Sequence, residues 1–246
     1  MTAIETHDLG VALGGLPILK DVSFTIPDGQ RVGLLGANGS GKTTLIRALL
    51  GLTPHQKGTV SLLGAPPGRF RAWRELGYVP QRASISLHAT TVWEVVVSGT
   101  LANRPVGWGR RGQNRLVGDA LEAVGLADQA KELYVHLSGG QQQRVLIARG
   151  IVNHPRLIIM DEPFAGVDLA TQADIATMLG ALDATFLVVL HETEAMAGLL
   201  DRTLILRQGR LVHDGPPDDS GTAPPHEATR TTPVPLLTGI ESPWTS

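Results

Sequence analysis

A short apolar segment followed by a glycine-rich loop and a helical pattern constrains the fold of this chain more than any other feature. Residues 31–35 have the pattern of a buried strand, and residues 36–43 read Gly-Ala-Asn-Gly-Ser-Gly-Lys-Thr. Apolar residues then recur at helical spacing up to Gly51, which suits a helix C-terminus. Glycines between a strand and a helix let backbone N–H groups curl around phosphate oxygens. The sequence therefore predicts a phosphate-binding loop.

Two side chains in this loop have expected roles in nucleotide binding. Lys42 should contact the β- and γ-phosphates, and the Thr43 hydroxyl should contact a magnesium ion. The alternative is a glycine-rich turn with only a structural role, but the predicted strand and helix lie where phosphate binding requires them. The residues expected to bind the nucleotide are Gly36, Ala37, Asn38, Gly39, Ser40, Gly41, Lys42, Thr43 and Thr44.

The alternation of strand and helix patterns predicts an α/β fold with a parallel sheet. Strand patterns at 4–9 and 18–26 open the chain, and Pro27-Asp28-Gly29 predicts a hairpin-like reversal before residue 31. Buried strands are expected at 157–160 and 185–190, with helical patterns between and around them. The pattern is typical of an α/β core.

A mainly helical segment, about residues 83–152, is expected to be a subdomain inserted into this core. Thr91 and Glu94 form a capping-box pattern ahead of one helix, and residues 114–124 predict a second. The composition changes from residue 214, where prolines fall among Thr, Ser and Gly with little apolar periodicity. We therefore expect one domain over residues 1–213 and a disordered tail over 214–246.

Composition excludes several classes of function. The chain has 246 residues, with 21 basic and 23 acidic side chains. It therefore lacks the excess of positive charge that non-specific binding of nucleic acid requires. It has no cysteine, which excludes disulfides, thiolate metal sites and cysteine nucleophiles. No apolar stretch is long enough to span a bilayer, and the N-terminus lacks a secretory signal pattern. The expected location is cytoplasmic.

A second motif narrows the class of phosphate-binding protein. Residues 137–141 read Leu-Ser-Gly-Gly-Gln and precede a helical pattern over residues 142–152. Ser138 and Gln141 have capping-box spacing, and Gly139 and Gly140 allow close approach to the positive helix end. A well-capped helix with no ligand is the alternative. With the phosphate loop upstream, however, this motif makes the chain resemble the ATP-binding cassette (ABC) family.

Further segments resemble the same family and follow its order. Residues 157–163 read Leu-Ile-Ile-Met-Asp-Glu-Pro, an apolar strand that ends in two carboxylates, as in a Walker B motif. Because neighbours on a strand point to opposite sides, Asp161 and Glu162 can have different roles. Ala165-Gly-Val-Asp168 resembles the D-loop, His191 the switch histidine and Gln81 the Q-loop. The resemblance covers roughly residues 4–213.

The resemblance implies a P-loop NTPase (RecA-like) core with an N-terminal antiparallel β subdomain and an inserted helical subdomain. It implies binding and hydrolysis of ATP with Mg²⁺. The implied catalytic residues are Glu162 as general base, His191 and Gln81, and the implied metal-contacting residues are Thr43, Gln81 and Asp161. Ser138, Gly139, Gly140 and Gln141 would bind the ATP held by a second copy, which gives a head-to-tail dimer with two nucleotides between the chains.

Two positions depart from the family pattern. The family has an aromatic residue that stacks on adenine before a glycine-containing turn, and the aligned residue here is Leu13, ahead of Gly14 and Gly15. The aspartate that commonly follows the switch histidine is replaced by Glu192, which can still favour the start of the next helix. We expect weaker contacts to adenine than in an aromatic relative.

The resemblance favours the motor subunit of a membrane transporter, located on the cytoplasmic side of the membrane. Its implied partners are an integral membrane permease, a second copy of itself and, indirectly, an extracytoplasmic substrate-binding protein, with no nucleic acid. The amino-acid sequences of several segments resemble those of ATPases of bacterial zinc and manganese importers. Import of a siderophore, haem or another metal complex is the runner-up, and a soluble non-transport ABC ATPase is a further alternative. The chain lacks the Asn-Lys-x-Asp motif by which GTPases recognise guanine, which argues against a GTPase.

Overall fold

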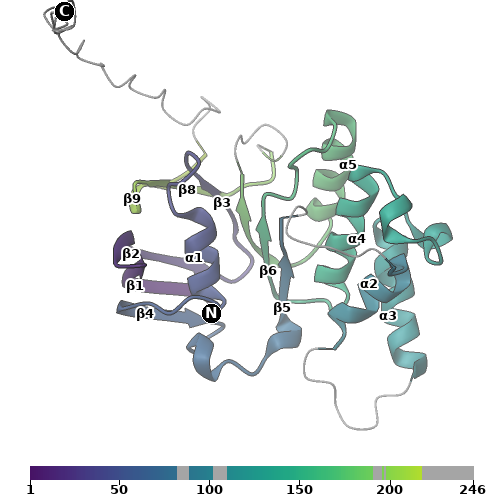
Figure 1. Cartoon of the computed structure of the whole chain (residues 1–246), viewed down its shortest axis with the longest axis horizontal. Helices are drawn as coiled ribbons and strands as arrows, with labels where there is room; N and C mark the ends of the chain where they lie inside the picture. The colour runs from purple at the N-terminus through teal and green to yellow at the C-terminus, as the bar shows by residue number, and fades with distance from the viewer. Residues whose placement is uncertain (82–88, 102–109, 191–195, 197, 218–246) are drawn as a thin grey trace, which may run out of the picture.

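Two β-sheets and a set of helices make up the part of the chain that the computed structural model describes, residues 1–81, 89–101, 110–190, 196 and 198–217. The smaller sheet lies on one side of the molecule and the helices α2–α5 lie on the other, with the larger sheet between them (Figure 1). The mixed α/β class predicted from the sequence is confirmed.

The smaller sheet is antiparallel and is formed near the N-terminus. Its strands are β1 (Thr2–Leu13), β2 (Leu16–Pro27) and β4 (Lys57–Leu62), in the order β2-β1-β4. Gly14 and Gly15 have φ values of 55° and 81° and make the tight turn between β1 and β2. The strand predictions at 4–9 and 18–26 are confirmed, and both strands are longer than predicted.

The larger sheet has the order β5-β6-β7-β3-β8-β9, in which β9 alone is antiparallel to its neighbour. The predicted strand at 31–35 matches its bounds, and those at 157–160 and 185–190 match within one residue. Its strands are β3 (Arg31–Leu35), β5 (Leu76–Val79), β6 (Leu157–Asp161), β7 (Thr185–Val189), β8 (Arg202–Arg207) and β9 (Arg210–Gly215).

The turn predicted at 27–29 is present, with Gln30 N–H donating to the Pro27 carbonyl oxygen at 3.3 Å, but the hairpin-like pairing predicted across it is wrong. Strands β2 and β3, which flank this turn, belong to different sheets and do not pair. β2 pairs instead with β1, while Gly29 N–H donates to Thr185 Oγ1 at 2.8 Å, at the start of a strand of the larger sheet. The turn therefore carries the chain from one sheet to the other, because the partner of β3 comes from distant sequence.

The helices of the inserted segment confirm its helical character. The capping box is present at the start of α2, where Thr91 and Glu94 exchange hydrogen bonds, and α3 covers the predicted 114–124 region up to Ala123.

Short 3₁₀ turns of the described chain lie at Pro67–Arg69, Trp73–Glu75, Ala127–Gln129 and Tyr134–His136. The helices are α1 (Lys42–Leu49), α2 (Val92–Gly99), α3 (Arg110–Ala123), α4 (Gly139–Ile151) and α5 (Leu169–Gly180).

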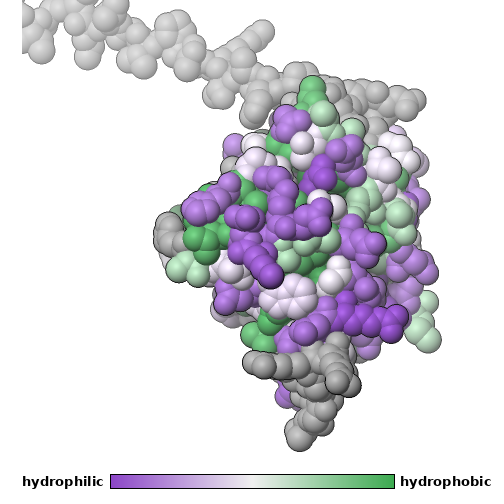
Figure 2. Space-filling model, turned by 90° about the vertical axis from the view of Figure 1, so that its right-hand side faces the viewer, coloured by the Kyte–Doolittle hydropathy of each residue, from purple (hydrophilic) through white to green (hydrophobic). Residues whose placement is uncertain are grey.

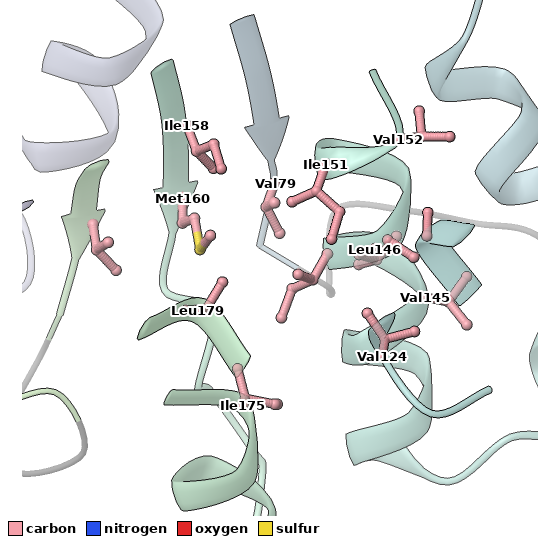
Figure 3. Packing of buried hydrophobic residues seen from close by; sticks show 14 of the residues in the cluster. Val79, Val124, Val145, Leu146, Ile151, Val152, Ile158, Met160, Ile175 and Leu179 are labelled. Carbon is pink, nitrogen blue, oxygen red and sulfur yellow. The ribbon is translucent and has the colours of Figure 1, made fainter. Parts of the chain in front are cut away.

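Alternate residues of the central strands enter two separate hydrophobic clusters. On β6, Ile158 and Met160 pack with α4 and α5, as Figure 3 shows, whereas Leu157 and Ile159 belong to the cluster that contains α1 and the smaller sheet. This is the period of two expected of a strand buried on both faces. By the same alternation, Asp161 is on the face of the sheet that α1 covers.

The outer face of the helical side is mostly hydrophilic. Figure 2 shows hydrophilic side chains over most of this face, with smaller hydrophobic patches between them. The helices are thus amphipathic, with their apolar sides in the core. Among the described residues, no helix is long and apolar enough to cross a bilayer.

The folded domain extends slightly past the predicted boundary at residue 213. Asp214 and Gly215 lie within β9, and Arg202 Nη2 donates to Asp214 Oδ2 at 2.6 Å. Residues 218–246 lie outside the described residues, so the disorder expected of the tail stays a prediction.

Candidate nucleotide-binding site

The loop between β3 and α1 has a backbone that requires glycine. Gly36, Gly39 and Gly41 have φ values of 147°, 78° and 109°, and Gly41 caps α1 in a left-handed conformation. A Cβ atom at Gly36 would lie 2.3 Å from the Leu206 carbonyl oxygen. Free N–H groups at the start of a helix form an anion site, so this loop can hold phosphate groups.

Lys42 lies over this loop in a buried position. Its Nζ donates to the carbonyl oxygens of Gly36 at 2.6 Å and Ala37 at 3.2 Å. Burial lowers the pKa of the ammonium, and the nearby carboxylates of Glu162 and Asp161 partly offset that effect. A buried cation at a helix N-terminus is suited to a polyphosphate, whose negative charge compensates its desolvation.

Asp161, at the end of β6, faces the start of α1. Burial raises the pKa of its carboxyl, the Glu162 carboxylate raises it further, and a hydrogen bond with Thr43 lowers it. Its Oδ1 and the Oγ of Ser40 are buried without a hydrogen-bond partner among the described residues. Unpartnered buried oxygens carry a free-energy cost that a cation would relieve. This arrangement fits a magnesium ion, which prefers oxygen ligands.

Glu162 does not continue the strand, contrary to the expectation that it alternates with Asp161. Its φ is 52°, a left-handed value uncommon outside glycine, so the turn after β6 sets the direction of its side chain. Gln81 follows β5, the neighbour of β6, and its Nε2 donates to Glu162 Oε2 at 2.8 Å. The structure thus brings together Lys42, Asp161, Glu162 and Gln81 at the carboxyl ends of parallel strands.

The turn between β8 and β9 supports the phosphate loop. This support is not predicted from the sequence. Gly209 N–H donates to the Ser40 carbonyl oxygen at 2.9 Å, and Lys20 N–H donates to the Gly209 carbonyl oxygen at 2.8 Å. Gly209 has a φ of 79°, and a Cβ atom there would lie 1.9 Å from the Ile18 carbonyl oxygen. The only sequence signal was Gln208-Gly209, a turn pattern between two strands.

We expect Gly209→Ala to unfold more easily and to bind nucleotide more weakly than the unsubstituted chain. Strain and clash together should lower the free energy of unfolding by about 2 kcal/mol or more. Gly64→Ala is the matched control, because Gly64 has a φ of 81° but open space around its Cβ position. Urea unfolding and nucleotide titration measure both effects; equal stability losses in the two variants would contradict the role of the contact with β2.

The Ser138–Gln141 segment forms the start of α4, with the predicted capping box. Ser138 N–H donates to Gln141 Oε1 at 2.9 Å, and Gln141 N–H donates to Ser138 Oγ at 3.3 Å. Ser138 is exposed, and a Cβ at Gly140 would lie 2.8 Å from Thr171 Cγ2 of α5. Within the described ranges, no hydrogen bond joins this segment to residues 36–44 of its own chain.

Of the remaining predicted site residues, Asp168 and Leu13 are placed by the structure, and two are not. Asp168 caps α5, since its Oδ1 accepts from Thr171 N–H at 3.0 Å, and this hydrogen bond lowers the pKa of its carboxyl. His191 and Glu192 lie outside the described residues. Leu13 is 46% exposed at the end of β1, opposite Leu16.

A family model described as "ABC transporter" matches residues 19–165, more than half of the chain. The match includes the phosphate loop, the Ser138–Gln141 segment and the Asp161-Glu162 pair. Two curated relatives extend the similarity over most of the chain. The zinc transport system ATP-binding protein TroB of Treponema pallidum is 39% identical over 87% of this chain and 81% of its own length.

The manganese transport system ATP-binding protein MntB of Bacillus subtilis is 37% identical over 86% of both chains. A solved structure of an inward-facing ABC transporter of suggested metal-chelate type is 26% identical, covers 87% of this chain and 83% of its own, and superposes with a TM-score of 0.75. The β subdomain, the parallel core and the inserted helices are therefore an arrangement shared with known proteins.

Proposed function

The chain belongs to the ABC transporter family, as an ATP-hydrolysing subunit, and from this premise we propose that it energises import of a divalent metal ion through a separate membrane permease. Zinc and manganese are the proposed cargo. The observation that carries the hydrolytic part is the convergence of Lys42, Asp161, Glu162 and Gln81 at one edge of the sheet.

The proposed roles follow from the chemistry of each group. Loop N–H groups from residue 36 to 44 and the Lys42 ammonium hold the phosphates. Thr43, Asp161 and Gln81 would hold Mg²⁺, which would neutralise negative charge on the phosphate oxygens. The buried, unpartnered Oδ1 of Asp161 supports this assignment.

Glu162 is the proposed general base. Water attacks the γ-phosphorus, its oxygen forms the new P–O bond, the bond to the bridging oxygen of ADP breaks, and the proton goes to Glu162. Gln81, bonded to this carboxylate, orients it and positions the water. His191 is proposed to contact the γ-phosphate, on the resemblance alone.

A second copy of the chain is proposed to complete each site. Ser138, Gly139, Gly140 and Gln141 present a capped, positive helix end that stands apart from the phosphate loop in the hydrogen bonding of its own chain. An exposed anion-binding helix end and a bound γ-phosphate on another copy are complementary. The proposed assembly is a head-to-tail dimer with two ATP molecules between the chains.

The proposed surface for the permease is a groove of about 300 Å³ between β5, the end of α1 and the helices α2 and α4. Arg149 lies in it, and burial lowers the pKa of its guanidinium. It donates to Ser98 Oγ at 3.0 Å, and none of the ion pairs among the described residues includes it. Asn153 Oδ1, also in the groove, is buried without a described partner. A permease segment with a carboxylate and a hydrogen-bond donor would satisfy both.

We expect Leu52→Asp, at the rim of this groove, to abolish most of the stimulation of ATP hydrolysis by the permease. Leu52 is 65% exposed, so the change should leave folding and basal hydrolysis intact. Losing an apolar anchor at an interface weakens binding by about tenfold or more. Val212→Asp, at an exposed position on β9, is the control. Full stimulation of the Leu52 variant would place the permease elsewhere.

Leu13 provides a prediction about the adenine site. A leucine covers a base by dispersion but has no π system, and aromatic stacking contributes about 0.5–1.5 kcal/mol. We therefore expect Leu13→Tyr to tighten ATP binding by roughly 2- to 12-fold, without raising turnover at saturation, because adenine contacts change little in the transition state. Titration with a fluorescent ATP analogue measures the affinity. Unchanged or weaker binding would mean that another residue already holds the base.

The cargo is proposed from the relatives named above, since the ATPase does not contact it. The runner-up is a siderophore, haem or another metal complex, which the structural neighbour of suggested metal-chelate type favours. The proposed location is the cytoplasmic side of the membrane, with an extracytoplasmic binding protein delivering the cargo to the permease.

The test is ATP hydrolysis by the chain assembled with its permease in proteoliposomes. The binding protein loaded with zinc or manganese should stimulate hydrolysis, and the same protein with a ferric siderophore or haem should not. Stimulation only by a metal complex would establish the runner-up. Hydrolysis that no cargo and no permease alters would contradict the transport function.

A further inference from the structure

A second cavity, of about 270 Å³, lies away from the nucleotide site. It is bordered by α3, the C-terminal end of α4, the beginning of β6 and the connection between α5 and β7. The parallel strands begin at this edge of the sheet, whereas the phosphate loop lies at their carboxyl ends. The cavity therefore has walls from both the inserted helices and the α/β core, and no role in the proposed hydrolysis.

The interior of this cavity is apolar. Ile151, Ile158 and Ala184 line it and are each less than 9% exposed. Ile151 on α4 and Ile158 on β6 lie on the two sides of the packing between helix and sheet (Figure 3). Such a surface favours an apolar body over an inorganic ion. Consistent with this, no group of three metal-binding side chains occurs among the residues that the structure describes.

Two carboxylates border the same cavity from different elements. Asp119 is on α3, and its ion pair is with exposed Arg115 of the same helix, at 3.8 Å. Asp183 precedes β7 and, within the described ranges, has no ion pair or hydrogen bond through its side chain. His154 also lines the cavity, and its N–H donates to the Ile151 carbonyl oxygen. The opening therefore carries two carboxylates, of which Asp119 has a cationic neighbour in Arg115 and Asp183 has none among the described residues.

We propose that this cavity binds a small organic cation that has an apolar body and an amidinium, guanidinium or ammonium group. The apolar body would contact the isoleucines, and the cationic group would lie between Asp119 and Asp183. Anions are disfavoured by the two carboxylates, and a neutral apolar molecule would gain no ion pair with Asp183. The ligand would contact both the inserted helices and the core.

Benzamidine is a suitable probe, because benzamide has nearly the same shape without the charge. Titration of the full chain by calorimetry should give a Kd of roughly 5 mM or tighter for benzamidine, as expected of a fragment of its size. Benzamide should bind at least about fivefold more weakly, which corresponds to the loss of partly exposed ion pairs. Equal binding of the two compounds would contradict the proposal.

Two variants locate the binding. Asp183→Asn should weaken benzamidine binding about threefold to fivefold, while Glu122→Gln, an exposed acid on α3 outside the cavity, should leave it unchanged. Ala123→Phe places a ring at an exposed lining position and should abolish binding of both compounds. Thermal unfolding without ligand confirms that each variant is folded. Benzamidine binding that survives Ala123→Phe, or that Glu122→Gln weakens as much as Asp183→Asn, would overturn the assignment.

Discussion

Replacing Glu162 with Gln should leave ATP binding intact and lower the turnover of the purified subunit by at least ~10²-fold. The carboxamide keeps the size of the side chain and can still bond to Gln81, but it cannot accept a proton from the attacking water. Single-turnover phosphate release measures the loss, and nucleotide titration checks binding. Glu132→Gln, at an exposed position in the helical segment, is the control for a change of charge alone.

The same variant should accumulate an ATP-bound dimer, because the two chains of the proposed dimer separate only after hydrolysis. Near-normal phosphate release by the Glu162 variant would remove this residue from the role of general base. Loss of ATP binding would instead show that the turn at Glu162, with its left-handed φ, supports the phosphate site structurally.

Ser138→Arg should be nearly inactive alone, as should Lys42→Ala, but a mixture of the two should recover hydrolysis. In a head-to-tail dimer of one copy of each, one composite site loses both groups, and the other keeps the intact loop and the intact helix end. At 1:1 mixing and random pairing, about a quarter of the composite sites are intact. Activity of the mixture, compared with each variant at the same total concentration, measures this complementation.

No recovery on mixing would contradict a site shared between copies. Retained activity of Ser138→Arg alone would reduce the Ser138–Gln141 segment to a helix cap. The capping box makes that second outcome a real alternative, since its hydrogen bonds account for the local structure without any ligand.

The features predicted correctly from the sequence are those that local physics determines. The phosphate loop requires glycine at positions with positive φ, and α1 and α4 start where the glycine loop and the capping box indicate. The strands of the core were visible as short apolar runs because both faces are buried.

The features that the sequence did not predict depend on distant partners. The turn at 27–29 has the local pattern of a hairpin-like reversal, and nothing local indicates that β3 pairs with β7 and β8. The contact of Gly209 with Ser40 joins segments far apart in the chain. The left-handed φ of Glu162 also depends on its surroundings, since a strand pattern alone predicts that Glu162 continues the alternation. Arg149 and Asn153 have no sequence pattern that indicates partner binding. Their role is inferred from burial, which lowers the pKa of the Arg149 guanidinium and leaves Asn153 Oδ1 without a described hydrogen-bond partner.

The proposed dimer holds ATP between the phosphate loop of one copy of the chain and the Ser138–Gln141 helix end of the other. Its most direct test is the mass and nucleotide content of the Glu162→Gln variant, measured by light scattering on a sizing column with radiolabelled ATP. With saturating MgATP, we expect a dimer that carries two ATP molecules, and without nucleotide we expect a monomer. A monomer that carries one ATP at saturation would contradict it.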